Sequence, residues 1–165
     1  MSQYTTIFGS LGHYDKGGVH VIDDDPKYYA FSNVFEVANH SAPYEKVAVG
    51  QNLEYVLEAI RAEGTSGWRV TPHDEFPLVM DGEVVVELLD PDAPLVDPDA
   101  HGSVAVEGVP AGTPMGTLTL GRGHMGLLPA GKCYRFSAEH PSVILLQTIA
   151  GPDTAFKWAE ICQTV

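Results

Sequence analysis

Glycine and proline interrupt this chain at short intervals, and this feature limits its fold more than any other. The 165 residues include 17 Gly and 12 Pro, which fall between short runs rich in β-branched and aromatic residues. Short strands joined by turns produce this pattern, and it is typical of an all-β sandwich or barrel. We therefore expect one domain over residues 1–165, with an N-terminal arm at about 1–50 and a long acidic loop at about 90–116.

The net charge of the chain argues against two classes of binding partner. Nine Lys and Arg residues stand against 22 Asp and Glu, which gives a formal net charge of −13. Such an acidic excess repels phosphate backbones and anionic head groups, so neither nucleic acid nor a membrane surface is expected as the main partner. The sequence has no basic leader with an apolar core, and its two cysteines are Cys133 and Cys162. Both features predict a cytoplasmic protein with buried thiols.

Two segments carry a helical pattern. In Gln51–Glu63 the apolar residues recur at three- and four-residue steps, Asn52 suits an N-cap and Gly64 suits a C-terminal stop. The tail Ala155–Cys162 predicts a second short helix. Both helices are expected to pack on the outside of the barrel.

The clearest predicted hairpin spans Phe76–Leu89. Asp81-Gly82 separates two β-rich runs there, and Asp-Gly suits a two-residue turn in which both central residues have positive φ. Another strand is predicted at Tyr28–Val37. The segment Asp90–Gly116 is predicted to be a solvated, proline-rich loop that includes one short strand, Val104–Glu107.

Two stretches resemble the signature motifs of the cupin superfamily of small β-barrels. Glu75 and Gly82 fit the Glu-x6-Gly end of the first motif, and Gly123, Pro129 and Gly131 fit the Gly-x5-Pro-x-Gly part of the second. The resemblance implies a cupin-type jelly roll with one or two short peripheral helices.

The cupin metal positions are degenerate in this sequence. The two histidines of the first motif fall on Arg69 and Thr71, the carboxylate falls on Glu75, and the histidine of the second motif falls on Tyr134. A guanidinium has no lone pair to offer a metal, and iron(II) prefers two or more imidazoles with a carboxylate. Arg69 paired with Glu75 could supply the positive charge in place of a cation.

A rearranged metal site is the alternative. His73 and Glu75 share a strand face, and His124 lies in the second motif, so these three residues could bind a metal in a self-sufficient cupin enzyme. A third reading is a metal-free cupin that binds a small ligand.

Longer stretches resemble the small subunit of two-component hydroquinone 1,2-dioxygenases. They include HDEFPLVMDGEVVVEL from His73, RGHMGLLPAGKCYRF from Arg122 and KWAEIC near the end. The resemblance implies an α2β2 heterotetramer that opens the ring of hydroquinone with O2 to give 4-hydroxymuconic semialdehyde. It also implies that Fe(II) is held by the large catalytic subunit, with no cofactor and no catalytic residue in this chain. Trp68 and Arg69 are the expected contacts with the partner or its substrate pocket, because Trp and Arg often anchor interfaces.

Overall fold

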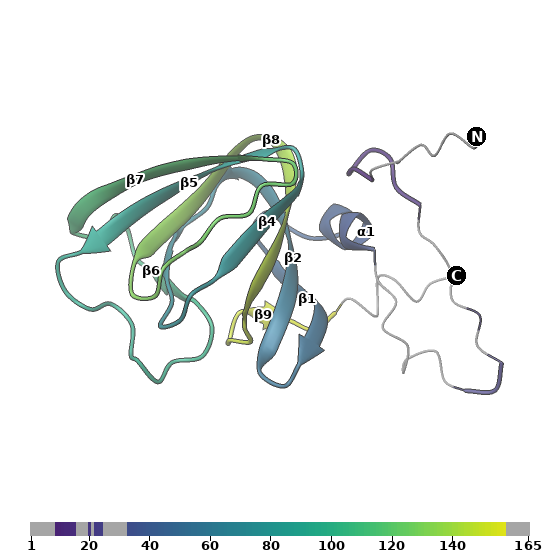
Figure 1. Ribbon diagram of the computed structural model, residues 1–165, viewed down its shortest axis with the longest axis horizontal. Coiled ribbons are helices and arrows are strands. Elements are labelled where there is room, and N and C mark those ends of the chain that lie inside the picture. The colour runs from purple at the N-terminus through teal and green to yellow at the C-terminus, as the bar shows by residue number, and fades with distance from the viewer. Residues whose placement is uncertain (1–8, 16–19, 21, 25–32, 158–165) are drawn as a thin grey trace, which may run out of the picture.

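A computed structural model describes residues 9–15, 20, 22–24 and 33–157. Within them the elements are α1 Val34–Asn39, β1 Lys46–Asn52, β2 Tyr55–Thr65, β3 Trp68–Val70, β4 Phe76–Asp81, β5 Glu83–Pro91, β6 Val104–Val106, β7 Gly112–Gly121, β8 Cys133–Ile149 and β9 Thr154–Ala155. The strands form one curled sheet, as Figure 1 shows, so the predicted all-β class is confirmed.

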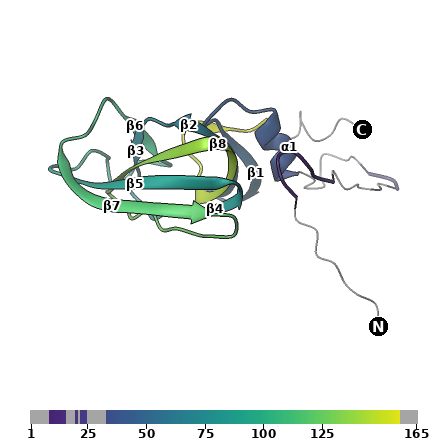
Figure 2. The same cartoon turned by 90° about the horizontal axis from the view of Figure 1, so that it is seen from above.

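The long strand β8 holds the sheet together. Its first half, residues 133–138, pairs with β5 on one side and with β3 and the end of β2 on the other. Its second half, residues 142–149, pairs with β2 and β4. The strand therefore belongs to both ends of the curled sheet, and in Figure 2 β6, β3, β5 and β7 follow one another from top to bottom of the view.

The segment Phe76–Leu89 is not a hairpin, contrary to the prediction. β4 and β5 do not pair with each other: β4 pairs with residues 143–147 of β8, and β5 pairs with residues 133–137. Gly82 has φ of 75° and packs against Ser142, whose hydroxyl accepts a hydrogen bond from the Glu83 N–H at 3.2 Å. Asp81-Gly82 therefore bends a nearly continuous strand around the middle of β8.

The predicted helix Gln51–Glu63 is also wrong, because this segment is the β1–β2 hairpin. Asn52 pairs with Tyr55, which leaves Leu53 and Glu54 as a two-residue turn. The inward positions of β2 are Val56, Glu58, Ile60 and Ala62, all of them buried. Glu58 is charged although it points inward, so the sequence of β2 lacks the regular alternation of apolar and polar residues that indicates a strand.

The short helix found among the described residues lies elsewhere. α1 occupies the end of the predicted strand Tyr28–Val37, with Asn33 as its N-cap, and residues 28–32 lie outside the described residues. Of the predicted helix Ala155–Cys162, Ala155 belongs to β9 and residues 158–162 lie outside the described part of the chain. Strand β6 crosses the predicted acidic loop and pairs with β3.

The largest cluster of buried residues fills the barrel interior, and smaller clusters lie on the outer face, two of them against α1. The interior cluster includes Ile60, Val79, Leu128, Phe136 and Leu146. On the outer face, Val37 of α1 packs against Val47 and Ala59. The inward residues of β2, β4 and β8 therefore line the barrel interior, where the candidate site described below lies.

Gly102 is expected to be one of the least replaceable residues. Its φ is 69°, and an added Cβ would lie 2.6 Å from the Cα of Gly151, whereas Gly108 has φ of 67° with open space around it. We expect Gly102→Ala to lower the free energy of unfolding by about 2–4 kcal/mol, because overpacking adds to a left-handed backbone penalty of about 1 kcal/mol. Gly108→Ala carries the backbone penalty alone and is the matched control in urea unfolding. Equal losses for the two variants would contradict the expectation.

Candidate functional site

The four residues that motif spacing assigns to the cupin metal positions lie together at the barrel interior. Arg69 of β3 is the register partner of Tyr134 of β8, so the two side chains leave the sheet on the same face. Thr71 and Glu75 are fully buried, and Tyr134 is 1% exposed. The fold thus assembles the positions that the cupin resemblance singled out, with different chemistry on them.

Both carboxylate oxygens of Glu75 are held by hydroxyl groups. The Tyr134 hydroxyl donates to Oε2 at 2.6 Å, and the Thr148 hydroxyl donates to Oε1 at 2.6 Å. Burial raises the pKa of Tyr134 well above its usual value of 10, and the adjacent carboxylate adds to the rise. Tyr134 therefore stays a neutral donor, and these charge-assisted bonds satisfy Glu75 without a cation.

Arg69 does not pair with Glu75, contrary to the prediction. Its guanidinium contacts the Asp153 carboxylate at 2.5 Å, and its Nε and Nη2 donate to Oγ and the backbone oxygen of Ser103 at 2.8 and 2.9 Å. Asp153 lies between β8 and β9, a position that sequence spacing does not connect to Arg69. The arginine therefore joins the acidic loop and the C-terminal segment to the mouth of the barrel.

A buried ion pair beside this network was missed by the sequence analysis. Lys46 Nζ lies 3.1 Å from Glu58 Oε2, and their side chains are 7% and 0% exposed. Thr154 donates to the other Glu58 oxygen at 2.7 Å, and Lys46 also donates to Ser103 Oγ at 2.8 Å. Burial raises the pKa of Glu58, and the Lys46 ammonium opposes the rise. The signal was Glu58 itself, a charged residue within the alternating buried positions of β2.

The rearranged metal site does not form. The His73 ring lies within the interior network, where Nε2 accepts the Ile149 N–H at 3.2 Å and lies 3.0 Å from the Thr148 hydroxyl. His124 is exposed, and its Nδ1 accepts the Gly121 N–H at 2.9 Å. The described residues include no group of three or more His, Cys, Asp or Glu that could hold a metal ion. His124 therefore completes a turn, and no third ligand joins His73 and Glu75 within the described part of the chain.

The interior does not fit a cupin iron. Such a site needs several imidazoles with a carboxylate, and here the carboxylate of Glu75 is taken up by two hydroxyls. Arg69 has no lone pair, and a neutral phenol such as Tyr134 is a poor metal ligand. The arrangement can position polar groups and hold charge, but it supplies no donor set for a metal.

His73 is expected to make stability depend on pH. Burial lowers its pKa from the usual 6.5, because the folded state disfavours the charged ring. The unfolded chain therefore binds the proton first, so the stabilisation is complete above pH 6.5 and is lost as pH falls through the lower folded-state pKa. Urea unfolding of wild type and His73→Gln between about pH 7.5 and about pH 5 should show a steeper loss for wild type. Parallel curves would contradict this.

Trp68 and Arg69 leave β3 on opposite faces. Trp68 is 7% exposed and packs with Val70, Leu89 and Cys133, away from the barrel interior. The Arg135 guanidinium lies 4.9 Å above its ring. Its indole Nε1 is buried without a hydrogen-bond partner. The expected joint contact of Trp68 and Arg69 with a partner stays a prediction, and a partner could reach the two residues only from different sides.

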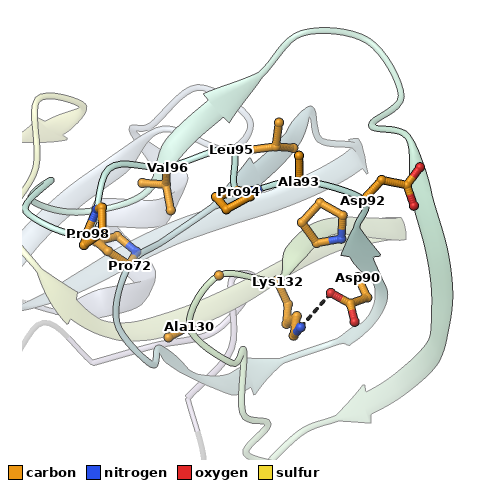
Figure 3. Close-up of a pocket in the computed structure, with 12 residues that line it drawn as sticks. Pro72, Asp90, Asp92, Ala93, Pro94, Leu95, Val96, Pro98, Ala130 and Lys132 are labelled. Carbon is orange, nitrogen blue, oxygen red and sulfur yellow. Dashed lines mark hydrogen bonds and ion pairs between the residues drawn. The ribbon is translucent and has the colours of Figure 1, made fainter.

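Two hollows are lined by residues of the candidate site or by their neighbours in the chain. A cavity of about 60 Å³ inside the barrel is lined by Lys46, Arg69 and Tyr134 among others. A groove of about 430 Å³ lies between the loop at 90–98 and the turn at 130–132, where Lys132 pairs with Asp90 at 2.6 Å (Figure 3). The inner cavity is far below the roughly 300 Å³ of ordinary small-molecule sites.

Comparison with solved structures places the chain in a family. It matches a chain of hydroquinone 1,2-dioxygenase from Sphingomonas sp. TTNP3, solved with 4-hydroxybenzoate bound, with 57% identity, a TM-score of 0.93, and 98% and 99% of the two chains covered. The chain belongs to the hydroquinone 1,2-dioxygenase subunits of the cupin superfamily. A chain of the dioxygenase PnpCD, in complex with Cd²⁺ and 4-hydroxybenzonitrile, matches at 54% identity and a TM-score of 0.92, with 97% of each chain covered.

A second kind of chain in these dioxygenases shares only the fold. A chain of PnpCD in complex with Fe³⁺ matches the subunit described here at 15% identity and a TM-score of 0.61, covering 84% of this chain and 38% of that one. That chain is therefore more than twice as long. No family model and no curated protein matches the sequence.

No helix among the described residues of this dioxygenase subunit is long and apolar enough to cross a membrane.

Proposed function

We propose that this chain is the small, non-catalytic subunit of a cytoplasmic, Fe(II)-dependent hydroquinone 1,2-dioxygenase. In this proposal a larger catalytic subunit holds the iron, and two copies of each chain form an α2β2 heterotetramer. The complex binds hydroquinone and O2 and opens the ring to 4-hydroxymuconic semialdehyde. The isolated small chain has no activity.

The state of Glu75 carries the proposal. Motif spacing assigns this residue to the cupin metal-binding carboxylate, and it is fully buried with both oxygens hydrogen-bonded to Tyr134 and Thr148. A catalytic iron site needs that carboxylate open to a cation, with imidazoles beside it. A barrel whose interior is closed in this way suits a structural subunit that stabilises or completes a catalytic one.

The alternatives have less support. A self-sufficient metal enzyme would need His73, Glu75 and His124 around one ion, but His124 caps an exposed turn. A metal-free cupin that binds a small ligand would need an interior site, and the cavity there measures about 60 Å³.

The partner contact at Trp68 and Arg69 remains part of the proposal. Arg69→Lys removes the forked contact with Asp153 and Ser103, and Trp68→Phe keeps most of the packing. Complex formation and ring cleavage should each be measured for both variants. If all these values equal the wild-type ones, the contact is excluded.

Co-expression with the larger cupin-fold chain tests the function. We expect the two chains to co-purify as a complex of four subunits by native mass spectrometry. The complex should contain iron and consume oxygen with hydroquinone, whereas the small chain alone should do neither. Failure to co-purify would contradict the proposal. So would stoichiometric iron together with hydroquinone turnover in the small chain alone.

A further inference from the structure

The outer surface of the sheet carries a row of side chains that are apolar at all positions but one. Across the ladder, Leu57 of β2 lies opposite Gln147 of β8, which lies opposite Phe76 of β4. Bridges join Leu78 to Met125 and Glu75 to Leu128 in antiparallel order, which sets Leu127 opposite Phe76. The row therefore crosses four neighbouring segments, and Gln147 is its one polar residue.

A second apolar row lies directly beside the first. Ala59 pairs with Leu145, Leu145 with Leu78, and Leu78 with Met125. The exposed fraction is 62% for Met125, 45% for Leu127 and 40% for Leu57. On the far side of the first row Tyr55 pairs with Ile149. Although the chain has a net charge of −13, none of the positions in these rows is charged.

The tip of the β1–β2 hairpin extends this surface. Leu53 has φ of 57° and is 80% exposed. Two-residue turns of this kind favour Asn or Gly, and a left-handed backbone costs a residue such as Leu about 1 kcal/mol. Because Leu53 is 80% exposed, its side chain buries little apolar area within this subunit. Beside it lies a shallow groove of about 300 Å³, lined by Gly50, Tyr55, Leu57 and Gln147 among others.

We propose that this outer apolar face, formed by Leu53, Tyr55, Leu57, Phe76, Met125 and Leu127, is the surface that binds the larger cupin-fold chain of the dioxygenase. The inference rests on the proposed function. PnpCD contains a chain that resembles this one along nearly its whole length and a longer chain with the same fold. A sheet face that carries apolar side chains, among them Tyr55, Phe76 and Met125, and no charged residue suits the core of such an interface.

A second copy of this chain is a less suitable occupant. Each copy has a net charge of −13, so two copies that pair through identical faces would repel each other electrostatically. The larger chain is therefore the occupant to which we assign the face.

Hydroxyl-radical footprinting of the wild-type complex tests the assignment without any substitution. Met125 and Met115 are 62% and 48% exposed in the isolated chain, and Met115 lies on β7, outside the outer apolar face. Complex formation with the larger chain should slow oxidation of Met125 about tenfold, as full burial in an interface core implies, and leave Met115 unchanged. Equal oxidation of Met125 in the free and bound chains would overturn the inference.

A pair of charge insertions provides the second test. Leu57→Glu and Phe76→Glu place a carboxylate in the proposed interface, whereas Val109→Glu inserts the same charge at an exposed site between β6 and β7. We expect the first two to weaken the Kd for the larger chain about 100-fold, because a buried charge without a partner is strongly unfavourable. Val109→Glu should bind as wild type does. Circular dichroism establishes that each variant is folded.

The outcomes separate the two proposals. If the wild-type chain does not bind the larger chain, the proposed function fails. If wild type and all three variants bind alike, the function stands and the assignment of this face is wrong. A wild-type chain that dimerises on its own, and becomes a monomer with Phe76→Glu, would also overturn the assignment, because the face would then join two copies.

Discussion

Replacing Lys46 with methionine is expected to lower the free energy of unfolding by about 3–5 kcal/mol. Lys46 and Glu58 are 7% and 0% exposed at their side chains, and their charges lie 3.1 Å apart. Lys46→Met leaves the Glu58 carboxylate buried with Thr154 as its remaining hydrogen-bond donor. Most of the loss comes from the uncompensated charge and not from the missing contact itself.

Urea unfolding with two controls checks this expectation. The double variant with Lys46→Met and Glu58→Leu removes both charges, so its stability should return to within about 1–2 kcal/mol of wild type. Arg61→Met removes an exposed pair with Glu63 and should change stability by less than about 1 kcal/mol. A Lys46→Met variant as stable as Arg61→Met would show that the buried pair has no net effect on folding.

A variant combining Arg69→His, Thr71→His and Tyr134→His is expected to gain a metal site. Residues 69 and 71 face the same side of their strand, and position 134 lies opposite position 69 in the ladder. In the wild type, Glu75 Oε2 accepts a hydrogen bond from the Tyr134 hydroxyl, so the Tyr134 change also frees this oxygen. Three imidazoles around a carboxylate should bind Co²⁺ with a Kd of about 1 µM or tighter, whereas wild type should show no binding.

Calorimetry and the absorption spectrum of Co²⁺ measure this gain. A further Glu75→Ala change in the triple variant is the control, and it should abolish binding or weaken it severely. A folded triple variant that binds no Co²⁺ would mean that side-chain identity at these positions is not what separates this interior from a metal-binding cupin.

The fold class was predictable because its signals are local. Gly and Pro between short β-type runs, together with the motif residues Glu75, Gly82 and Gly131, predicted a cupin barrel, and the structure confirms it. The resemblance to hydroquinone dioxygenase small subunits led to the family that the solved structures establish. Turn residues report backbone conformation directly, so they remain informative without knowledge of the neighbours.

The errors occurred where distant partners decide the structure. Gln51–Glu63 looked helical because Glu58, an inward residue, is neutralised by Lys46 and Thr154 from other strands. Asp81-Gly82 looked like a hairpin turn, but β8 is long enough to pair with the strands on both sides of it.

For the candidate site, the sequence likewise predicted the residues but not their interaction partners. The degenerate positions Arg69, Thr71, Glu75 and Tyr134 follow from motif spacing, and the fold brings them together. The partners of these residues do not follow from it: Arg69 binds Asp153, and Glu75 binds Thr148. Both partners come from residues 148–153, more than seventy positions away along the chain.

By itself the sequence determined the all-β class, the cupin resemblance and the loss of imidazoles at the metal positions, because these depend on residue type and short spacing. Only the tertiary structure decided what replaces the cation: hydroxyls on Glu75, a buried Lys46–Glu58 pair, and Asp153 on Arg69. The physical reason is that a buried charge is stabilised by whichever group the fold places within about 3 Å, and chain separation does not limit that choice.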